Sequence, residues 1–194
     1  MRLFVALDID SAIRARIVDY VRDLKHHAPG VRFVDPETYH ITLKFLGETT
    51  RINEVVAALS VIGFPGFEVS LAGTGFFPTP RAARVFWAGI QWPSCEDSLP
   101  QLAGIVSATL APLGFAPEKG SYHPHLTLAR AGSGSPSPRR GESANPKMQR
   151  LAEHLASLPA PEFGTMTARE FVLYESRLSP QGAQYIAQHR FPLE

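Results

Sequence analysis

The chain has 194 residues, of which 44% are hydrophobic and 19% are charged, a composition typical of a globular protein with a sizeable core. This length fits one domain or two small lobes. The 19 Lys and Arg residues against 18 Asp and Glu residues leave a formal net charge of +1. That balance argues against a polybasic nucleic-acid coat and against membrane attachment through bulk charge. An anionic substrate must therefore be bound by local groups.

The single cysteine, Cys95, excludes an internal disulfide and a four-cysteine zinc site. Asp8 interrupts the first apolar residues too early for the apolar region of a signal peptide. No apolar run approaches the roughly 18 residues of a membrane span. We therefore expect a cytoplasmic protein without a membrane or an obligate protein partner.

Apolar periodicity predicts alternating strands and helices. In chain order, we expect a strand over 3–9, a helix from residue 13 to near Pro29-Gly30, strands over 31–34 and 40–46, a helix from about 53 to 62, strands over 67–71 and 85–90, a helix over 99–113, a strand over 125–128, a mobile loop over 131–147, a helix over 148–158 and a strand over 171–174. The loop assignment follows from the Gly, Ser and Pro content of that segment.

Two short patterns recur in the same order along the chain. Arg-x-Phe-x-Ala occurs at residues 2–6 and 84–88, and His-apolar-Thr-Leu occurs at 40–43 and 125–128. We interpret these matches as an approximate internal repeat within a single bilobal domain, with halves of about 1–80 and 81–194. The alternative is a chance match among common residues. A true repeat predicts two similar α+β lobes, each with one His motif.

Side chains alternate between the two faces of a strand, so His40 and Thr42 should project to one side and their apolar neighbours to the other. The same alternation applies to His125 and Thr127. If the lobes pack about an approximate two-fold axis, two imidazoles and two hydroxyls converge across a cleft.

Paired imidazoles suit a reaction that needs a base on one side of a centre and an acid on the other. In phosphodiester cleavage, a neutral His accepts a proton from the attacking water and a protonated His gives one to the leaving ribose oxygen. The hydroxyls of Thr42 and Thr127 can donate hydrogen bonds to the phosphate oxygens. Arg130 can add a forked positive charge, and Lys44 follows the first motif less specifically. We expect no metal and no other cofactor.

Further segments accompany the paired His-x-Thr motifs. They are Thr-Leu-Lys-Phe-Leu-Gly-Glu at 42–48, His-Pro-His-Leu-Thr-Leu-Ala-Arg at 123–130, Leu-Tyr-Glu-Ser at 173–176 and Ser-Pro-Gln-Gly at 179–182. Together they resemble the two-histidine phosphoesterase superfamily. Within it, the chain is most similar to the bacterial and archaeal RNA 2′,3′-cyclic phosphodiesterase family, also called 2′-5′ RNA ligase. The resemblance runs from Arg2 to about Tyr185.

This resemblance implies an α+β fold with two pseudo-symmetric lobes of antiparallel sheet, helices on the outside and an active-site cleft between the lobes. It implies hydrolysis of a terminal 2′,3′-cyclic phosphate of RNA to a 2′-phosphomonoester. Reverse ligation would follow from microscopic reversibility. The resemblance also assigns His40 as the proton donor and His125 as the proton acceptor, an order that the symmetric motifs themselves do not supply.

A zinc site formed by His40, His123 and His125 is the metal alternative. Neither motif supplies a carboxylate at ligand spacing, and Thr is a poor zinc ligand, so we favour the metal-free interpretation. We assign no chemistry to the remaining histidines, which are His26, His27, His154 and His189.

Several aromatic and basic residues are candidates for RNA contacts. Phe45 and Tyr122 can stack a base, as can Phe76 and Phe77, although burial in the core is the alternative for each. The Arg139-Arg140 pair can steer an RNA backbone or can be an ordinary solvated pair.

Two other functions remain open from the sequence. One is phosphodiester hydrolysis of another substrate, such as a nucleotide-sugar cyclic phosphate or a 2′-5′ oligonucleotide. The other is a non-catalytic module that binds RNA end phosphates. Turnover would distinguish a binding module from either enzyme.

Overall fold

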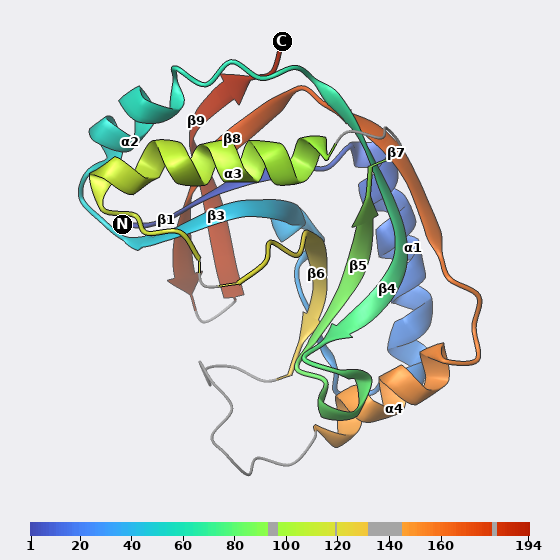
Figure 1. The fold of residues 1–194 in the computed structure, drawn as a ribbon. Helices are drawn as coiled ribbons and strands as arrows, with labels where there is room; N and C mark the ends of the chain where they lie inside the picture. Colours follow the sequence, from blue (N-terminus) through green and yellow to red (C-terminus); the bar gives the residue numbers. More distant parts are fainter. Residues whose placement is uncertain (93–96, 119, 132–144, 180–181) are drawn as a thin grey trace.

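The computed structural model describes residues 1–92, 97–118, 120–131, 145–179 and 182–194. Its strands form two antiparallel sheets (Figure 1). The first sheet has the order β3 (His40–Glu48), β1 (Arg2–Asp8), β8 (Glu170–Ser179), β9 (Gly182–Pro192). The second has the order β2 (Arg32–Phe33), β6 (His125–Arg130), β5 (Val85–Gln91), β4 (Phe67–Phe77), β7 (Glu162–Ala168). The predicted α+β fold class is confirmed.

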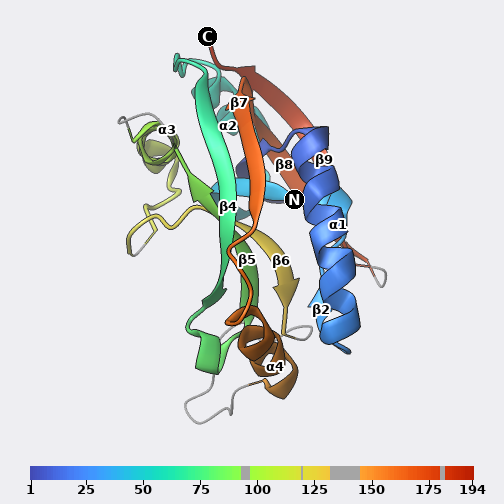
Figure 2. The ribbon, with the colours of Figure 1, turned by 90° about the vertical axis from the view of Figure 1, so that its right-hand side faces the viewer.

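Helices lie along the outside of this pair of sheets (Figures 1 and 2). They are α1 (Ser11–His27), α2 (Ile52–Leu59), α3 (Ser98–Leu110) and α4 (Pro146–Leu155), with short 3₁₀ helices η1 (Pro36–Thr38), η2 (Pro80–Ala82) and η3 (Ala111–Leu113). The helix α1 packs against β7, α3 packs against β3, and α4 packs against η2. In the part of the chain that the structure describes, none of the helices has the length and apolar character needed to cross a membrane. The cytoplasmic location inferred from the sequence stays a prediction.

The two sheets repeat one strand arrangement. In the first, β3 lies beside β1, followed by β8 and β9; in the second, β6 lies beside β5, followed by β4 and β7, with β2 added at the edge. The strands with the recurring motifs therefore occupy equivalent positions. However, β4 and β2 come from the first half of the chain, whereas β8 and β9 come from the second. The boundary expected near residue 80 consequently does not separate the two sheets.

The helix boundaries differ from the expected ones. Ile62 lies outside α2, and Leu158 lies outside α4. The expected loop over 131–147 extends too far, because α4 begins at Pro146 with Asn145 as its N-cap. Asn at the N-cap and Pro at the first helical position are preferred helix-start residues, which explains this correction. Residues 132–144, including the Arg139-Arg140 candidate, lie outside the described residues, as does Cys95.

The sequence did not predict two of the strands, β7 and β9, nor the continuation of β4 beyond Leu71. The strand β9 is mostly exposed, so it lacks an apolar period, and it is instead held by its pairing with β8. The strand β7 contains Gly164, which has a φ of +117°. A glycine inside a strand weakens the sequence pattern that predicts one. The strand β4 continues past Leu71 through Gly75, where a Cβ would lie 2.2 Å from the Trp87 ring. A larger side chain at that position would displace the indole.

Candidate active site

The two His motifs meet where the sheets adjoin. The strands β3 and β6 belong to different sheets and contact one another (Figure 1). His40 and Thr42 are partly exposed while their apolar neighbours are buried, and the same pattern holds for His125 and Thr127. The charge of His125 contributes to lowering the pKa of His40, so the two rings interact electrostatically. The tertiary structure thus brings together the four motif residues named from the sequence.

Each His strand contains a β-bulge just after its Thr. The pairing of β3 with β1 skips Leu43, and the pairing of β6 with β5 skips Leu128. A bulge shifts the alternation of side chains by one residue. In both strands two consecutive residues are therefore buried, and the next residue is exposed on the side of the Thr. That residue is Phe45 in β3 and Arg130 in β6.

This shift explains why the two cations that follow the motifs have different positions. The Lys44 side chain is only 2% exposed, and its Nζ donates hydrogen bonds to Ser107 Oγ at 3.1 Å and to the Ala116 carbonyl at 2.9 Å. Arg130 is exposed, and its Nη2 donates to Thr127 Oγ1 at 3.4 Å. The expectation that Lys44 supplies charge to the site is therefore wrong, because the bulge turns this side chain toward α3.

Backbone carbonyls fix the tautomers of both imidazoles. His40 Nδ1 lies 2.7 Å from the Thr38 carbonyl, and His125 Nδ1 lies 2.8 Å from the His123 carbonyl. A carbonyl only accepts hydrogen bonds, so each Nδ1 carries a proton and each Nε2 is left for proton transfer. His40 Nε2 lies 3.0 Å from Thr42 Oγ1. His125 Nε2 forms no hydrogen bond with a described residue.

The surroundings favour neutral imidazoles. Burial lowers the pKa of His40 below the usual 6.5, an effect that the hydrogen bond to Thr38 partly offsets. Burial likewise lowers the pKa of His125, and the charge of Arg130 lowers both values further. Asp8 acts on His40 in the opposite direction, because its carboxylate raises that pKa. The two otherwise similar histidines therefore differ in having or lacking a nearby carboxylate.

Aromatic rings hold both imidazoles from the side. The ring of His40 lies 4.9 Å from that of Phe4 and 5.1 Å from that of Tyr185, between centroids. The ring of His125 lies 5.0 Å from that of Phe77, edge to face. The sequence made Phe77 a candidate for base stacking, but it gave no role to Phe4 or Tyr185. Tyr185 comes from β9, the strand without an apolar period.

The two aromatic residues proposed for base stacking differ in exposure. The Phe45 side chain is 58% exposed, and its ring lies 6.1 Å from that of Phe4. Tyr122 is half-buried, and its hydroxyl donates a hydrogen bond of 2.8 Å to the Thr42 carbonyl. Phe45 is thus available to an incoming base, whereas Tyr122 connects the segment before β6 to β3.

A polar network beside His40 was not predicted from the sequence. Asp8 lies directly opposite His40 in the β1–β3 ladder and accepts hydrogen bonds from the Tyr174 hydroxyl and, at 3.2 Å, from Arg190 Nη1. These residues, His40 and Tyr185 help to line a cavity of about 270 Å³. Only strand pairing places them together, since they are far apart in the sequence.

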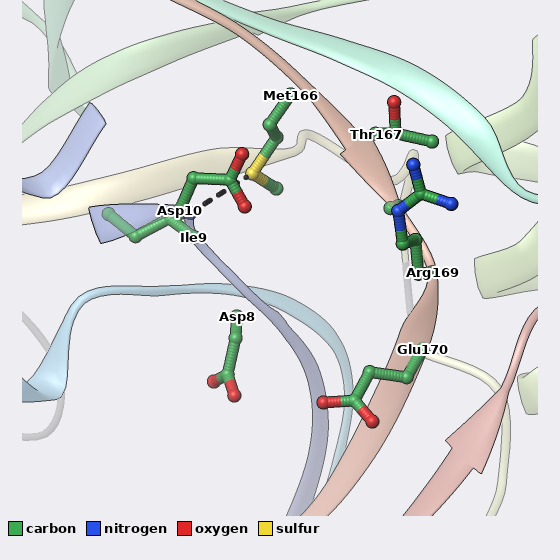
Figure 3. Close-up of a pocket in the computed structure, with 8 residues that line it drawn as sticks. Asp8, Ile9, Asp10, Met166, Thr167, Arg169 and Glu170 are labelled. Carbon is green, nitrogen blue, oxygen red and sulfur yellow. Dashed lines mark hydrogen bonds between the residues drawn. The ribbon is translucent and has the colours of Figure 1, made fainter. Parts of the chain in front are cut away.

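A larger cavity of about 460 Å³ is also lined by Asp8, but by neither motif histidine (Figure 3). Its lining includes the carboxylates of Asp8, Asp10 and Glu170, with Arg169 as its one cation. An excess of carboxylates opposes the binding of a phosphate group. The larger cavity is therefore less suited to a phosphate than the face that bears the histidines.

Among the described residues, no group of three or more His, Cys, Asp or Glu side chains is arranged to hold a metal ion. His40, His123 and His125, which formed the zinc alternative, are included in that finding. His123 is exposed outside β6, and its Nε2 lies 2.7 Å from Ser121 Oγ. The zinc alternative therefore has no arranged ligand set in the described part of the chain.

Comparisons with known proteins point to a single family. The family model described as LigT like Phosphoesterase matches residues 7–87 and 91–185. The chain is 35% identical to the RNA 2′,3′-cyclic phosphodiesterase of Archaeoglobus fulgidus, over 95% of this chain and 96% of that protein. It is 34% identical to the protein of the same name from Methanothermobacter thermautotrophicus, over 100% of this chain and 99% of that protein. The crystal structure of E. coli LigT complexed with 3′-AMP matches with a TM-score of 0.74 at 27% identity, covering 99% of this chain and 97% of that one. These matches confirm the resemblance inferred from the paired motifs.

Proposed function

Because this chain belongs to the LigT-like phosphoesterase family, we propose that it hydrolyses the 2′,3′-cyclic phosphate at the end of an RNA or oligonucleotide, leaving a 2′-phosphomonoester. The observation that carries this proposal is the convergence of two His-x-Thr strands from separate sheets. In each strand a backbone carbonyl holds the imidazole Nδ1, so Nε2 is the nitrogen that can exchange a proton with a substrate. The names of the Archaeoglobus and Methanothermobacter relatives support the substrate class.

In the proposed reaction, His125 Nε2 accepts a proton from a water molecule whose oxygen attacks the phosphorus. The bond between phosphorus and the 3′ oxygen breaks, and His40 Nε2 gives its proton to that oxygen. The products are a 2′-phosphate and a 3′-hydroxyl. Thr42, Thr127 and Arg130 bind the phosphate oxygens, where negative charge increases in the transition state.

The asymmetry between the histidines supports this order of roles. A proton donor must be charged before it acts, and Asp8 favours the charged form of His40. A proton acceptor needs a free lone pair, and His125 Nε2 has no hydrogen-bond partner among the described residues. The phosphate of a bound substrate would further favour protonation of His40.

The same geometry extends the proposal in two directions. Phe45 is exposed beside the site and can stack the base of the terminal nucleotide. Attack of a ribose 5′-hydroxyl on the cyclic phosphate, in place of water, would break the same bond to the 3′ oxygen and join RNA ends through a 2′-5′ bond.

Activity should survive exhaustive chelation, because proton transfer and hydrogen bonding from the named residues need no metal. The measurement is incubation of a cyclic-phosphate-ended oligonucleotide with the protein and excess EDTA, followed by chromatographic identification of the product. Many equivalents of 2′-phosphomonoester per chain are expected. Stoichiometric binding without product would indicate a binding module, and a loss of turnover that zinc or magnesium restores would contradict the mechanism.

The dependence of kcat/KM on pH should be bell-shaped with its maximum below about pH 6.5, the ordinary imidazole pKa. The rate rises as the acceptor loses its proton and falls as the donor loses its own. Because burial lowers the pKa of both histidines, both limbs should lie on the acidic side of that value. A maximum above pH 7, with chemistry rate-limiting, would contradict this expectation.

The variant Asp8→Asn tests whether the alkaline limb of that pH profile belongs to His40. Removing the carboxylate should lower the pKa of His40, so the alkaline limb should move to lower pH. The acidic limb, attributed to His125, should move less. A selective shift of the acidic limb would instead reverse the assigned roles.

A further inference from the structure

A third cavity, of about 350 Å³, is lined by Arg130 and by neither motif histidine. Four of the described residues that line it are cationic, namely Arg32, Arg130, Lys147 and Arg150, and none is acidic. They come from β2, β6 and α4, and β2 is far from the other two elements in the sequence. In a protein of net charge +1, this basic pocket is a local concentration of positive charge.

The cations of the basic pocket are placed in two like-charged pairs. Arg32 and Arg130 lie directly opposite one another in the β2–β6 ladder, where paired side chains share a face. Lys147 and Arg150 are three residues apart on α4, so they too are neighbours on one helix face. Both arrangements repel, and no described carboxylate forms an ion pair with any of the four. A bound polyanion would relieve this repulsion.

The basic pocket is continuous with the face that bears the catalytic candidates. Arg130 lines it and also donates its hydrogen bond to Thr127 Oγ1. Gly30 also lines the pocket, with a φ of +78°, and a Cβ there would lie 2.8 Å from Lys147 Nζ. The absence of a side chain at Gly30 thus leaves room for the ammonium group in the pocket.

We propose that the basic pocket binds the internal phosphates of the RNA strand on the 5′ side of the terminal nucleotide. The inference rests on the proposed function, because a 2′,3′-cyclic phosphate leaves only the 5′ oxygen of that nucleotide to connect it to the rest of the chain. The cyclic phosphate lies at the two histidines, and the next phosphates extend past Arg130 toward Arg32 and α4. The protein therefore prefers an oligonucleotide to a cyclic mononucleotide.

The test compares two substrates, 2′,3′-cyclic AMP and a short oligoadenylate with the same cyclic end. The double variant Lys147→Gln/Arg150→Gln removes two exposed cations that do not touch the reacting atoms. Its kcat/KM for the oligonucleotide should fall about tenfold, while that for the mononucleotide is unchanged. The salt dependence should weaken by roughly 0.7 in log–log slope for each phosphate of the single strand that the variant no longer neutralises. Arg22→Gln, an exposed change on α1 outside the pocket, should alter neither substrate.

Three results distinguish failure of the RNA subsite from failure of the proposed function. Equal losses on both substrates, or no loss on either, would overturn the basic pocket as an RNA subsite. If the wild-type protein turned over neither substrate, the proposed function would fail instead. The pocket would still be tested by fluorescence anisotropy with a labelled oligoadenylate that ends in a 3′-phosphate. An affinity and a salt slope unchanged by the double variant would then reject it.

Discussion

Replacing His40 or His125 with alanine should lower the rate of cyclic-phosphate hydrolysis by about 10²- to 10⁴-fold, because each variant loses one of the two proposed proton transfers. The geometry gives both residues the same ring orientation, with Nδ1 held by a backbone carbonyl and Nε2 left for the substrate. The measurement is single-turnover hydrolysis of a cyclic-phosphate-ended oligonucleotide, with folding checked by circular dichroism.

His123→Ala is the matched control for these variants. His123 is two residues from His125, but its side chain is exposed and lies against Ser121. Its replacement should leave the rate within about twofold of the wild type, because surface substitutions have small effects. His40→Gln provides a second variant that retains more side-chain volume, in case the space that alanine leaves between Phe4 and Tyr185 impairs folding. Near-normal turnover in a folded His40 or His125 variant would remove that residue from the mechanism.

The residual activities should also separate the two roles. Without His125, the rate should lose the rise with pH that is attributed to the acceptor and keep the fall attributed to the donor. Without His40, the opposite is expected. This comparison is needed because the limbs of the wild-type profile belong to a coupled pair.

Arg130→Gln should lower kcat/KM by about 10²- to 10³-fold, the usual cost of removing one preorganised donor from a developing negative charge. Glutamine keeps much of the length of the side chain but loses the charge and the forked geometry. The pH profile should move to higher pH as well, because the charge of Arg130 lowers the pKa of both histidines. Stopped-flow or quench measurements from about pH 4.5 to 8.5 would record both effects, bracketing the ordinary imidazole pKa.

Arg177→Gln is the control for this loss of charge. Arg177 is exposed and pairs with Glu175, and it lines none of the three cavities described above. Glu175 is buried, but it keeps a hydrogen bond from Gln188 Nε2 when Arg177 is replaced, so activity should remain close to that of the wild type. If Arg130→Gln lowered the rate no more than Arg177→Gln does, Arg130 would not contact the phosphate.

Much of the candidate site was predictable because the direction of each motif side chain depends only on the alternation within its own strand. The alternation within His40–Leu43 and within His125–Leu128 places polar residues on one face and core residues on the other without reference to any other element. The strand arrangement repeated in the two sheets agrees with the order of the recurring motifs.

Strand pairing determined the features of the site that have no signal in the sequence. The bulges after the two Thr residues depend on the ladders with β1 and β5, and they bury Lys44 while exposing Arg130. Asp8 and Tyr185 reach His40 from β1 and β9, and β9 has too few buried residues to produce a period. No pattern within one segment contains this information.

By itself, the sequence determined the chemical groups of the site, their faces on each strand and the family to which they belong, because these follow from local periodicity and from motif residues. Only the tertiary structure decided which of the two cations after the motifs lies beside Thr127, which carboxylate acts on which imidazole, and that three further cations gather with Arg130 around one cavity. The physical reason is that electrostatic effects depend on distances through space, and those distances are set by strand register and sheet packing between residues remote in sequence.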